Sequence, residues 1–108
     1  METNPGKMEI KSKQEIYDAI VLYLFNNGGV FSDWFVGVTA DPENRLFNEH
    51  KVNKEKGLWI YRKASCLKDA LIVKEALVTS QKINAVASTT NRNSVYVYAY
   101  KKSNEDEN

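Results

Sequence analysis

The sequence predicts an α+β domain in which a small three-stranded sheet packs against about three helices. Segments with apolar residues at helical spacing alternate with short segments rich in β-branched and aromatic residues, in the order helix, strand, helix, strand, helix, strand. A chain of 108 residues forms one domain with a modest core. Since three strands cannot make a large sheet, helices must cover it to complete that core.

The chain divides into three parts by composition. Residues 1–11 are polar with a Pro-Gly step and predict a flexible leader, residues 12–102 form the domain, and the acidic residues 103–108 predict a disordered tail. No apolar run approaches a membrane span, and the first residues do not resemble a signal peptide. We therefore expect a cytoplasmic protein with no membrane partner, as a monomer or homodimer. Its single cysteine, Cys66, excludes an internal disulfide and a cysteine-cluster metal site.

The first three elements have clear boundaries. Ser12 and Glu15 fit a capping box that begins a helix over about 13–26. An apolar, β-branched strand follows around 33–39, and a second helix is expected over about 42–52.

The turn between this strand and the second helix carries the strongest functional signal. Asp41 and Pro42 predict an N-cap and a first helical residue, and Arg45 follows one turn later. Gly37 has no Cβ, so backbone or ligand can approach the strand closely there. The fork-shaped, always-charged side chain of Arg45 suits phosphate binding. The alternative is a surface ion pair between Arg45 and Glu49.

The second half of the chain supplies the remaining elements. A strand is expected over 58–63, then a helix over about 66–82 with Ser65 as its N-cap. This helix is apolar on nearly every side, which predicts burial on several sides. Residues 95–100 alternate strictly between small apolar residues and tyrosines, which is typical of a strand.

The charge distribution favours a polyanionic partner such as DNA or RNA. The net charge is +1, but residues 1–102 hold 15 basic and 11 acidic residues. Residues 51–68 alone hold six basic residues and one acidic residue. A solvated lysine-rich loop is the alternative. His50 is the only histidine, so no zinc-ligand set is present, and a position on the helix surface is expected for it. The candidate nucleic-acid-binding residues are Gly37, His50, Lys51, Lys54, Arg62 and Lys63.

Three features together resemble the GIY-YIG nuclease superfamily over about residues 33–84. Phe35-Val36-Gly37 stands where that family has its second signature, Tyr-Ile-Gly, and Arg45 follows at the spacing of the family's arginine. Residues 69–77 resemble the helical element that carries the family's metal-binding glutamate, which would be Glu75.

The resemblance implies cleavage of a nucleic-acid phosphodiester with one divalent metal ion, such as Mg²⁺. A tyrosine would take a proton from water, Arg45 would stabilise the phosphate, and Glu75 would hold the metal. The alternative for Glu75 is a position on the helix flank, paired with a lysine or with water. Apart from Mg²⁺, no cofactor is implied.

Two departures from the family weaken the expectation of catalysis. Phe35 has no hydroxyl group, and the family's first signature is missing, because the second signature is preceded by the helix over 13–26. The strand at 95–100 is additional to the family pattern and is expected to fill the vacant sheet position. It would then bring Tyr96, Tyr98 or Tyr100 to the catalytic face.

These observations predict a GIY-YIG-like nucleic-acid-binding domain with impaired or lost endonuclease activity. One alternative is an active metal-dependent endonuclease that uses Arg45 and Glu75. The other is a protein-interaction domain without a nucleic-acid role, which would use the tyrosine-bearing strand at 95–100.

Overall fold

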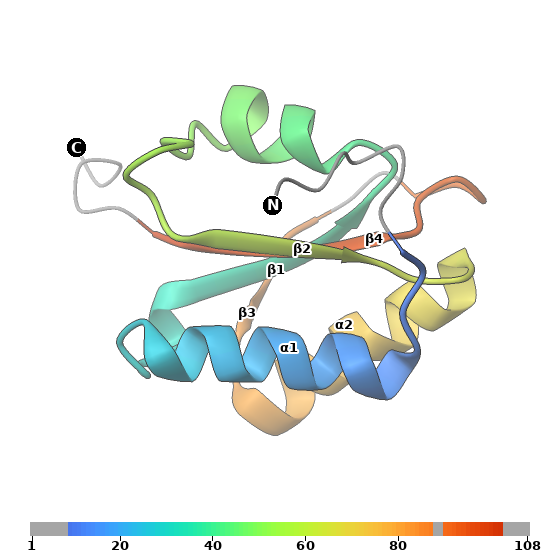
Figure 1. Cartoon of the computed structure of the whole chain (residues 1–108), viewed down its shortest axis with the longest axis horizontal. Coiled ribbons are helices and arrows are strands. Elements are labelled where there is room, and N and C mark those ends of the chain that lie inside the picture. The colour runs from blue at the N-terminus through green and yellow to red at the C-terminus, as the bar shows by residue number, and fades with distance from the viewer. Residues whose placement is uncertain (1–8, 88–89, 103–108) are drawn as a thin grey trace.

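The structure, a computed structural model of the chain, describes residues 9–87 and 90–102. It confirms the α+β class, with helices and strands distributed as Figure 1 shows. The elements are α1 (Lys13–Asn26), the 3₁₀ turn η2 (Phe31–Asp33), β1 (Trp34–Thr39), the π-helical η3 (Asn44–Glu49), β2 (Trp59–Lys63), α2 (Leu67–Gln81), β3 (Asn84–Ala85) and β4 (Tyr96–Lys101).

The sheet has four strands in the order β2-β4-β1-β3, so the prediction of three strands is wrong. The additional strand, β3, pairs in parallel with β1 through two residues only. The Val86 backbone N–H donates to the Val36 carbonyl at 2.9 Å, just beyond this pairing. A two-residue strand is too short to show an alternating pattern, which is why the sequence did not reveal it.

Strand β4, the last in chain order, occupies a central position in the sheet. It is antiparallel to β1 on one side and to β2 on the other, and Tyr98 is paired with both Gly37 and Tyr61. The end of β4 lies beside the start of β1, since the Lys102 backbone N–H donates to the Asp33 carbonyl at 2.9 Å. The strand at 95–100 therefore lies beside the strand that carries Phe35-Val36-Gly37.

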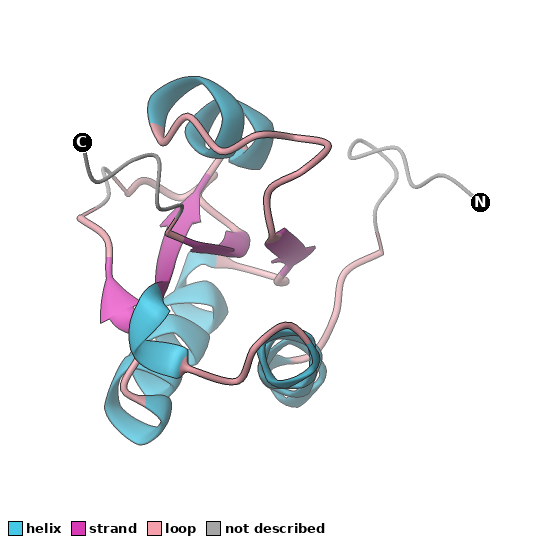
Figure 2. Ribbon diagram, turned by 90° about the vertical axis from the view of Figure 1, so that its left-hand side faces the viewer, coloured by secondary structure: helices cyan, strands magenta, loops and turns pink. Residues whose placement is uncertain are grey.

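The two faces of the sheet are covered by different helices. Helices α1 and α2 lie on one face, and the helical segment that includes η3 lies on the other (Figures 1 and 2). The alternation along β4 matches this arrangement, because Val97 and Ala99 join the core against α1 and α2. Tyr98 instead joins a second buried cluster with Leu46 and Tyr61.

Helix α1 begins and ends at the predicted residues. The Ser12 hydroxyl accepts the Glu15 backbone N–H at 3.1 Å, and the Glu15 carboxylate accepts the Ser12 backbone N–H at 2.9 Å, which confirms the capping box. Ile16, Ile20 and Leu24 line its buried side. Within the described residues, neither this helix nor any other has the length and apolar character needed to span a membrane.

Helix α2 is buried on one side only, so its predicted burial on several sides is wrong. Ala70, Val73 and Leu77 face the core, whereas Leu71 and Ile72 are 38% and 42% exposed. The N-cap is Cys66 and not Ser65. The Ser65 hydroxyl instead donates to the Asp69 carboxylate at 2.9 Å.

The predicted flexible leader lies mostly outside the described residues, which begin at Glu9. Its described end is attached to the sheet, because Ile10 bridges Lys63 and the Lys11 backbone N–H donates to the Lys63 carbonyl at 2.8 Å. The predicted acidic tail at 103–108 lies outside the described residues.

Candidate functional site

Arg45 is presented by a widened helical turn. The Asp41 carboxylate accepts the Asn44 backbone N–H at 3.1 Å, so Asp41 caps the segment as predicted. The His50 backbone N–H then donates to the Arg45 carbonyl at 2.8 Å, a bond that spans five residues and defines a π-helical turn. In such a turn, residues four and five positions apart share a face. Arg45, Glu49 and His50 therefore project together.

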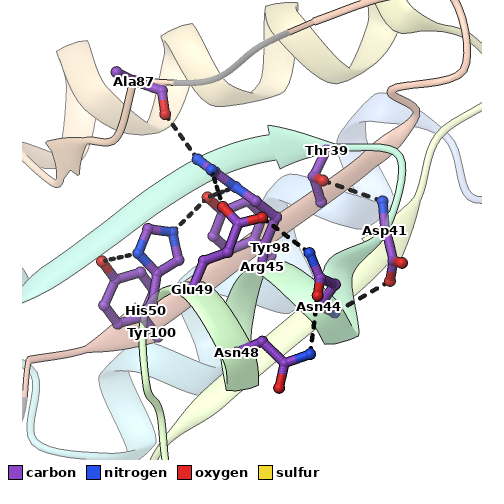
Figure 3. A network of polar contacts seen from close by, with 10 residues as sticks. All are labelled: Thr39, Asp41, Asn44, Arg45, Asn48, Glu49, His50, Ala87, Tyr98 and Tyr100. Atoms are coloured by element: carbon purple, nitrogen blue, oxygen red, sulfur yellow. Dashed lines mark hydrogen bonds and ion pairs between the residues drawn. The ribbon is translucent and has the colours of Figure 1, made fainter.

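The Arg45 guanidinium group makes three hydrogen bonds to three separate parts of the chain (Figure 3). It donates to the Glu49 carboxylate at 2.6 Å, to the Tyr98 hydroxyl at 3.3 Å and to the Ala87 carbonyl at 2.7 Å. Burial disfavours the charged form, but the hydrogen bonds to Glu49 and Tyr98 outweigh it and raise the pKa of Arg45. The Arg45–Glu49 ion pair, which the sequence offered as the alternative to phosphate binding, is present, and the guanidinium is also held against the sheet.

His50 lies between two tyrosines of β4. Its Nε2 is 2.9 Å from the Tyr98 hydroxyl and its Nδ1 is 3.2 Å from the Tyr100 hydroxyl. Its ring also stacks on Tyr100 with a centroid distance of 4.7 Å. The half-buried His50 is therefore not the surface helix residue that the sequence predicted. Burial lowers the pKa of His50, the positive charge of Arg45 lowers it further, and Glu49 partly offsets both effects.

This depressed pKa predicts a pH-dependent stability. As the pH falls, a group whose pKa is lower in the folded state takes up its proton in the unfolded state before it does so in the folded state. We therefore expect the free energy of unfolding to fall as the pH drops from the ordinary histidine value of 6.5 toward the folded-state pKa of His50. Urea denaturation at a series of pH values measures this decrease. In His50→Gln the decrease over this interval should become smaller, and an unchanged pH profile in that variant would contradict the assignment.

Gly37 accommodates the ring of Tyr98. The two residues are direct partners in the β1–β4 pairing. A Cβ atom at Gly37 would lie 2.5 Å from the Tyr98 Oη and 2.6 Å from its Cζ, far inside van der Waals contact. The predicted close approach at this glycine is thus made by a side chain of the protein itself, which covers the strand at that point.

Phe35 stacks on Tyr100 with a centroid distance of 5.4 Å, and Tyr98 lies opposite Gly37 on the neighbouring strand. The Tyr98 hydroxyl lies between Arg45 and His50 (Figure 3), so the strand at 95–100 brings one of its tyrosines beside Arg45. Tyr96, the first residue of β4, packs edge-on against Tyr61. Of the three tyrosines, Tyr98 and Tyr100 therefore contact the cluster around His50.

Glu75 lies on α2, in the helical layer on the other face of the sheet, and its side chain is exposed. Within residues 9–87 and 90–102, no three His, Cys, Asp or Glu side chains are grouped to hold a metal ion. The carboxylate beside Arg45 belongs to Glu49, which is already bonded to Arg45 and to the Asn44 side chain. The described donors therefore do not fit a divalent metal beside Arg45, and the Mg²⁺ site at Glu75 stays a prediction.

The predicted basic residues do not all share one side of the sheet, because Arg62 lies apart from Lys51, Lys54 and Lys63. Lys51 and Lys54 are exposed in the connection after η3, and the Lys54 ammonium lies 5.5 Å from the Phe47 ring. Lys63 lies on the tyrosine face of the sheet, 5.9 Å from the Tyr96 ring. Arg62 is one residue away along β2, so alternation places it on the opposite face, with Ile60.

Sequence reasoning missed two partners of Arg45 and one neighbouring cation. The Ala87 carbonyl left no signal, because any residue supplies a backbone carbonyl. Tyr98 belonged to a visible tyrosine stripe, but its pairing partner was unknown. Lys74 was overlooked in favour of the adjacent Glu75, although the Lys74 ammonium donates to the Val86 carbonyl at 2.9 Å.

Comparisons of this chain with protein-family models, with curated proteins and with solved structures give no match. The functional assignment therefore depends on the geometry of the cluster around Arg45.

Proposed function

We propose that this chain is a nucleic-acid-binding domain related to the GIY-YIG nucleases, with impaired or lost endonuclease activity. The observation that supports the proposal is the fixed position of the Arg45 guanidinium beside His50 and Tyr98. A fork of N–H donors held in one orientation suits a phosphate group, because less conformational entropy is lost on binding. Tyr98 is completely buried, so its hydroxyl serves Arg45 and His50 and does not reach a substrate directly.

The position of β4 supports the relationship to the family. The resemblance requires two signature strands close together in sequence, with the glycine-bearing strand second. Here β4 is antiparallel to β1 and ends where β1 begins, at the bond between Lys102 and Asp33. A short turn between those points would produce a hairpin of two adjacent strands. In the proposed relationship, β4 takes the place of the family's first signature strand, although it comes last in the chain.

A phosphate group would bind Arg45 by replacing Glu49. The Arg45–Glu49 pair is an i,i+4 ion pair whose carboxylate side chain is 46% exposed, and such pairs contribute only about 0.2–0.5 kcal/mol. The bonds to Tyr98 and Ala87 would remain and keep the guanidinium in place. Lys51, Lys54 and Lys63 would add attraction that does not depend on sequence.

Replacing Arg45 with glutamine tests the proposal. Loss of one phosphate contact should weaken binding about five-fold at about 0.15 M salt and reduce the slope of log K against log salt by about one. Fluorescence anisotropy with labelled single-stranded and duplex DNA and RNA measures both quantities. Arg62→Gln is the matched control, because β2 directs Arg62 to the opposite face, and we expect it to bind like the wild type.

Two results would contradict the proposal. Equal losses in the two arginine variants would mean that Arg45 has no special place in the interface. Absence of salt-sensitive binding in the wild type would favour the alternative of a protein-interaction domain through the tyrosine-bearing strand.

A metal-dependent endonuclease is the second candidate, and the Tyr98 hydroxyl is the observation that favours it. This hydroxyl contacts both His50 and Arg45, so a proton that it exchanges would pass through His50 and not directly to a substrate. The test is incubation of plasmid and structured RNA with Mg²⁺ or Mn²⁺, with Glu75→Ala as the control. Cleavage that requires Glu75 would establish this function in place of the binding domain.

A further inference from the structure

Lys74 reaches the same edge of the sheet as Arg45. Its ammonium donates to the Val86 carbonyl at 2.9 Å, while the Arg45 guanidinium donates to the Ala87 carbonyl at 2.7 Å. These carbonyls belong to consecutive residues just after β3. Lys74 belongs to α2 and Arg45 to η3, and these two elements cover opposite faces of the sheet (Figures 1 and 2). The two cations therefore donate to consecutive carbonyls of one short segment of backbone.

Of the two cations at this edge, Arg45 is paired with the Glu49 carboxylate, whereas Lys74 has no carboxylate partner among the ion pairs of the described residues. The ion pairs among the described residues join Lys11 to Glu9, Lys13 to Asp69 and Arg45 to Glu49, so none of these pairs includes Lys74. Burial lowers the pKa of Lys74; Glu75 partly opposes this, and the positive charge of Arg45 lowers the pKa further. An anion bound beside Lys74 and Arg45 would favour the charged form of Lys74.

We propose that Lys74 and Arg45 form a single binding site for a phosphate group of the nucleic acid, at the edge of the sheet beyond β3. This inference rests on the proposed function and adds Lys74 as a second residue that binds the phosphate group. The ammonium of Lys74 acts as a compact point charge and the guanidinium of Arg45 as an oriented fork, and both are common phosphate ligands. The sequence pattern pointed to Glu75 and gave no role to the adjacent Lys74.

The site also explains how phosphate can bind here without a divalent metal. The resemblance implied a carboxylate of α2 that holds a metal ion beside the phosphate. The α2 side chain that reaches the backbone next to Ala87, the acceptor of Arg45, is that of Lys74, whereas Glu75 is exposed. Since Lys74 itself supplies positive charge, binding to DNA should be unchanged by a metal chelator.

The first experiment compares Lys74→Gln with Lys68→Gln, a matched change at an exposed lysine of the same helix. Anisotropy titrations with labelled DNA, with and without chelator, should show about five-fold weaker binding for Lys74→Gln and a salt slope smaller by about one. Lys68→Gln should bind like the wild type, and Lys74→Arg, which keeps the charge, should recover most of the affinity. Equal affinities for Lys74→Gln and Lys68→Gln would overturn the inference.

The second experiment separates this inference from the proposed function. Inorganic phosphate is titrated into the whole chain while NMR follows the side-chain signals of Lys74 and Arg45. Both should shift with one dissociation constant, and the pKa of Lys74 should rise on binding, an effect that a purely structural bond to Val86 would not produce. If DNA binds but the Lys74 signals do not respond, the inference fails and the proposed function stands. If phosphate shifts both residues but DNA does not bind, the anion site is real and the proposed function fails.

Discussion

Replacing Gly37 with alanine is expected to destabilise the fold by about 1–3 kcal/mol, as overpacking of a filled site does. The new methyl group would lie 2.5 Å from the Tyr98 Oη. The Tyr98 ring cannot move aside cheaply, because its hydroxyl is bonded to Arg45 and His50 and its strand pairs on both sides. In a domain of this size, each kcal/mol lowers the melting temperature by about 4–8 °C, so thermal and urea denaturation will both detect the change.

The control for this prediction is a double-mutant cycle with Tyr98→Val. Once the ring is removed, the alanine at position 37 has room, and its additional cost should largely disappear. A Gly37→Ala variant as stable as the wild type would show that the strand and the ring do not need this close approach.

Replacing Tyr98 with phenylalanine is expected to cost about 1–3 kcal/mol of stability, because it leaves buried polar groups without a partner. The ring is preserved, so the loss comes from the hydroxyl that meets the Arg45 Nε and the His50 Nε2. The guanidinium should then be less well fixed, and the affinity for nucleic acid should also fall. Urea denaturation and anisotropy titration measure the two effects on the same preparation.

Tyr100→Phe is the matched control for that substitution. It removes a hydroxyl that lies 3.2 Å from the His50 Nδ1 and is not the acceptor in any of the three Arg45 hydrogen bonds described above. Its effect on affinity should be small. If Tyr98→Phe retains wild-type stability and affinity, the hydroxyl does not hold the arginine in place.

Features set by local interactions could be predicted from the sequence. The capping box at Ser12 and the N-cap at Asp41 satisfy backbone donors within a few residues, so residue types alone indicate where helices begin. The alternation of β4 likewise reports which residues share a face, and it placed the three tyrosines together correctly. The ion pair between Arg45 and Glu49 follows from helical spacing.

Features that depend on distant parts of the chain could not be predicted in the same way. Nothing near His50 indicates that two tyrosines about fifty residues later will enclose it. Which side chains of α2 face the sheet edge is decided by packing of Val73 and Leu77 against the core, and residue types alone do not reveal it. The two-residue β3 depends on its pairing with β1 and has no pattern of its own.

The central position of β4 has a consequence for how the chain is made. Strands β1 and β2 are not neighbours, so during synthesis neither can form its antiparallel ladder until the ribosome has delivered residues 96–101. Before that point, a nascent chain displays two strands that lack their antiparallel partner and carry large aromatic side chains, including Trp34 and Trp59. Such edges readily pair with other unfinished chains and aggregate. The demand for chaperone protection should therefore be greatest immediately before this last strand inserts.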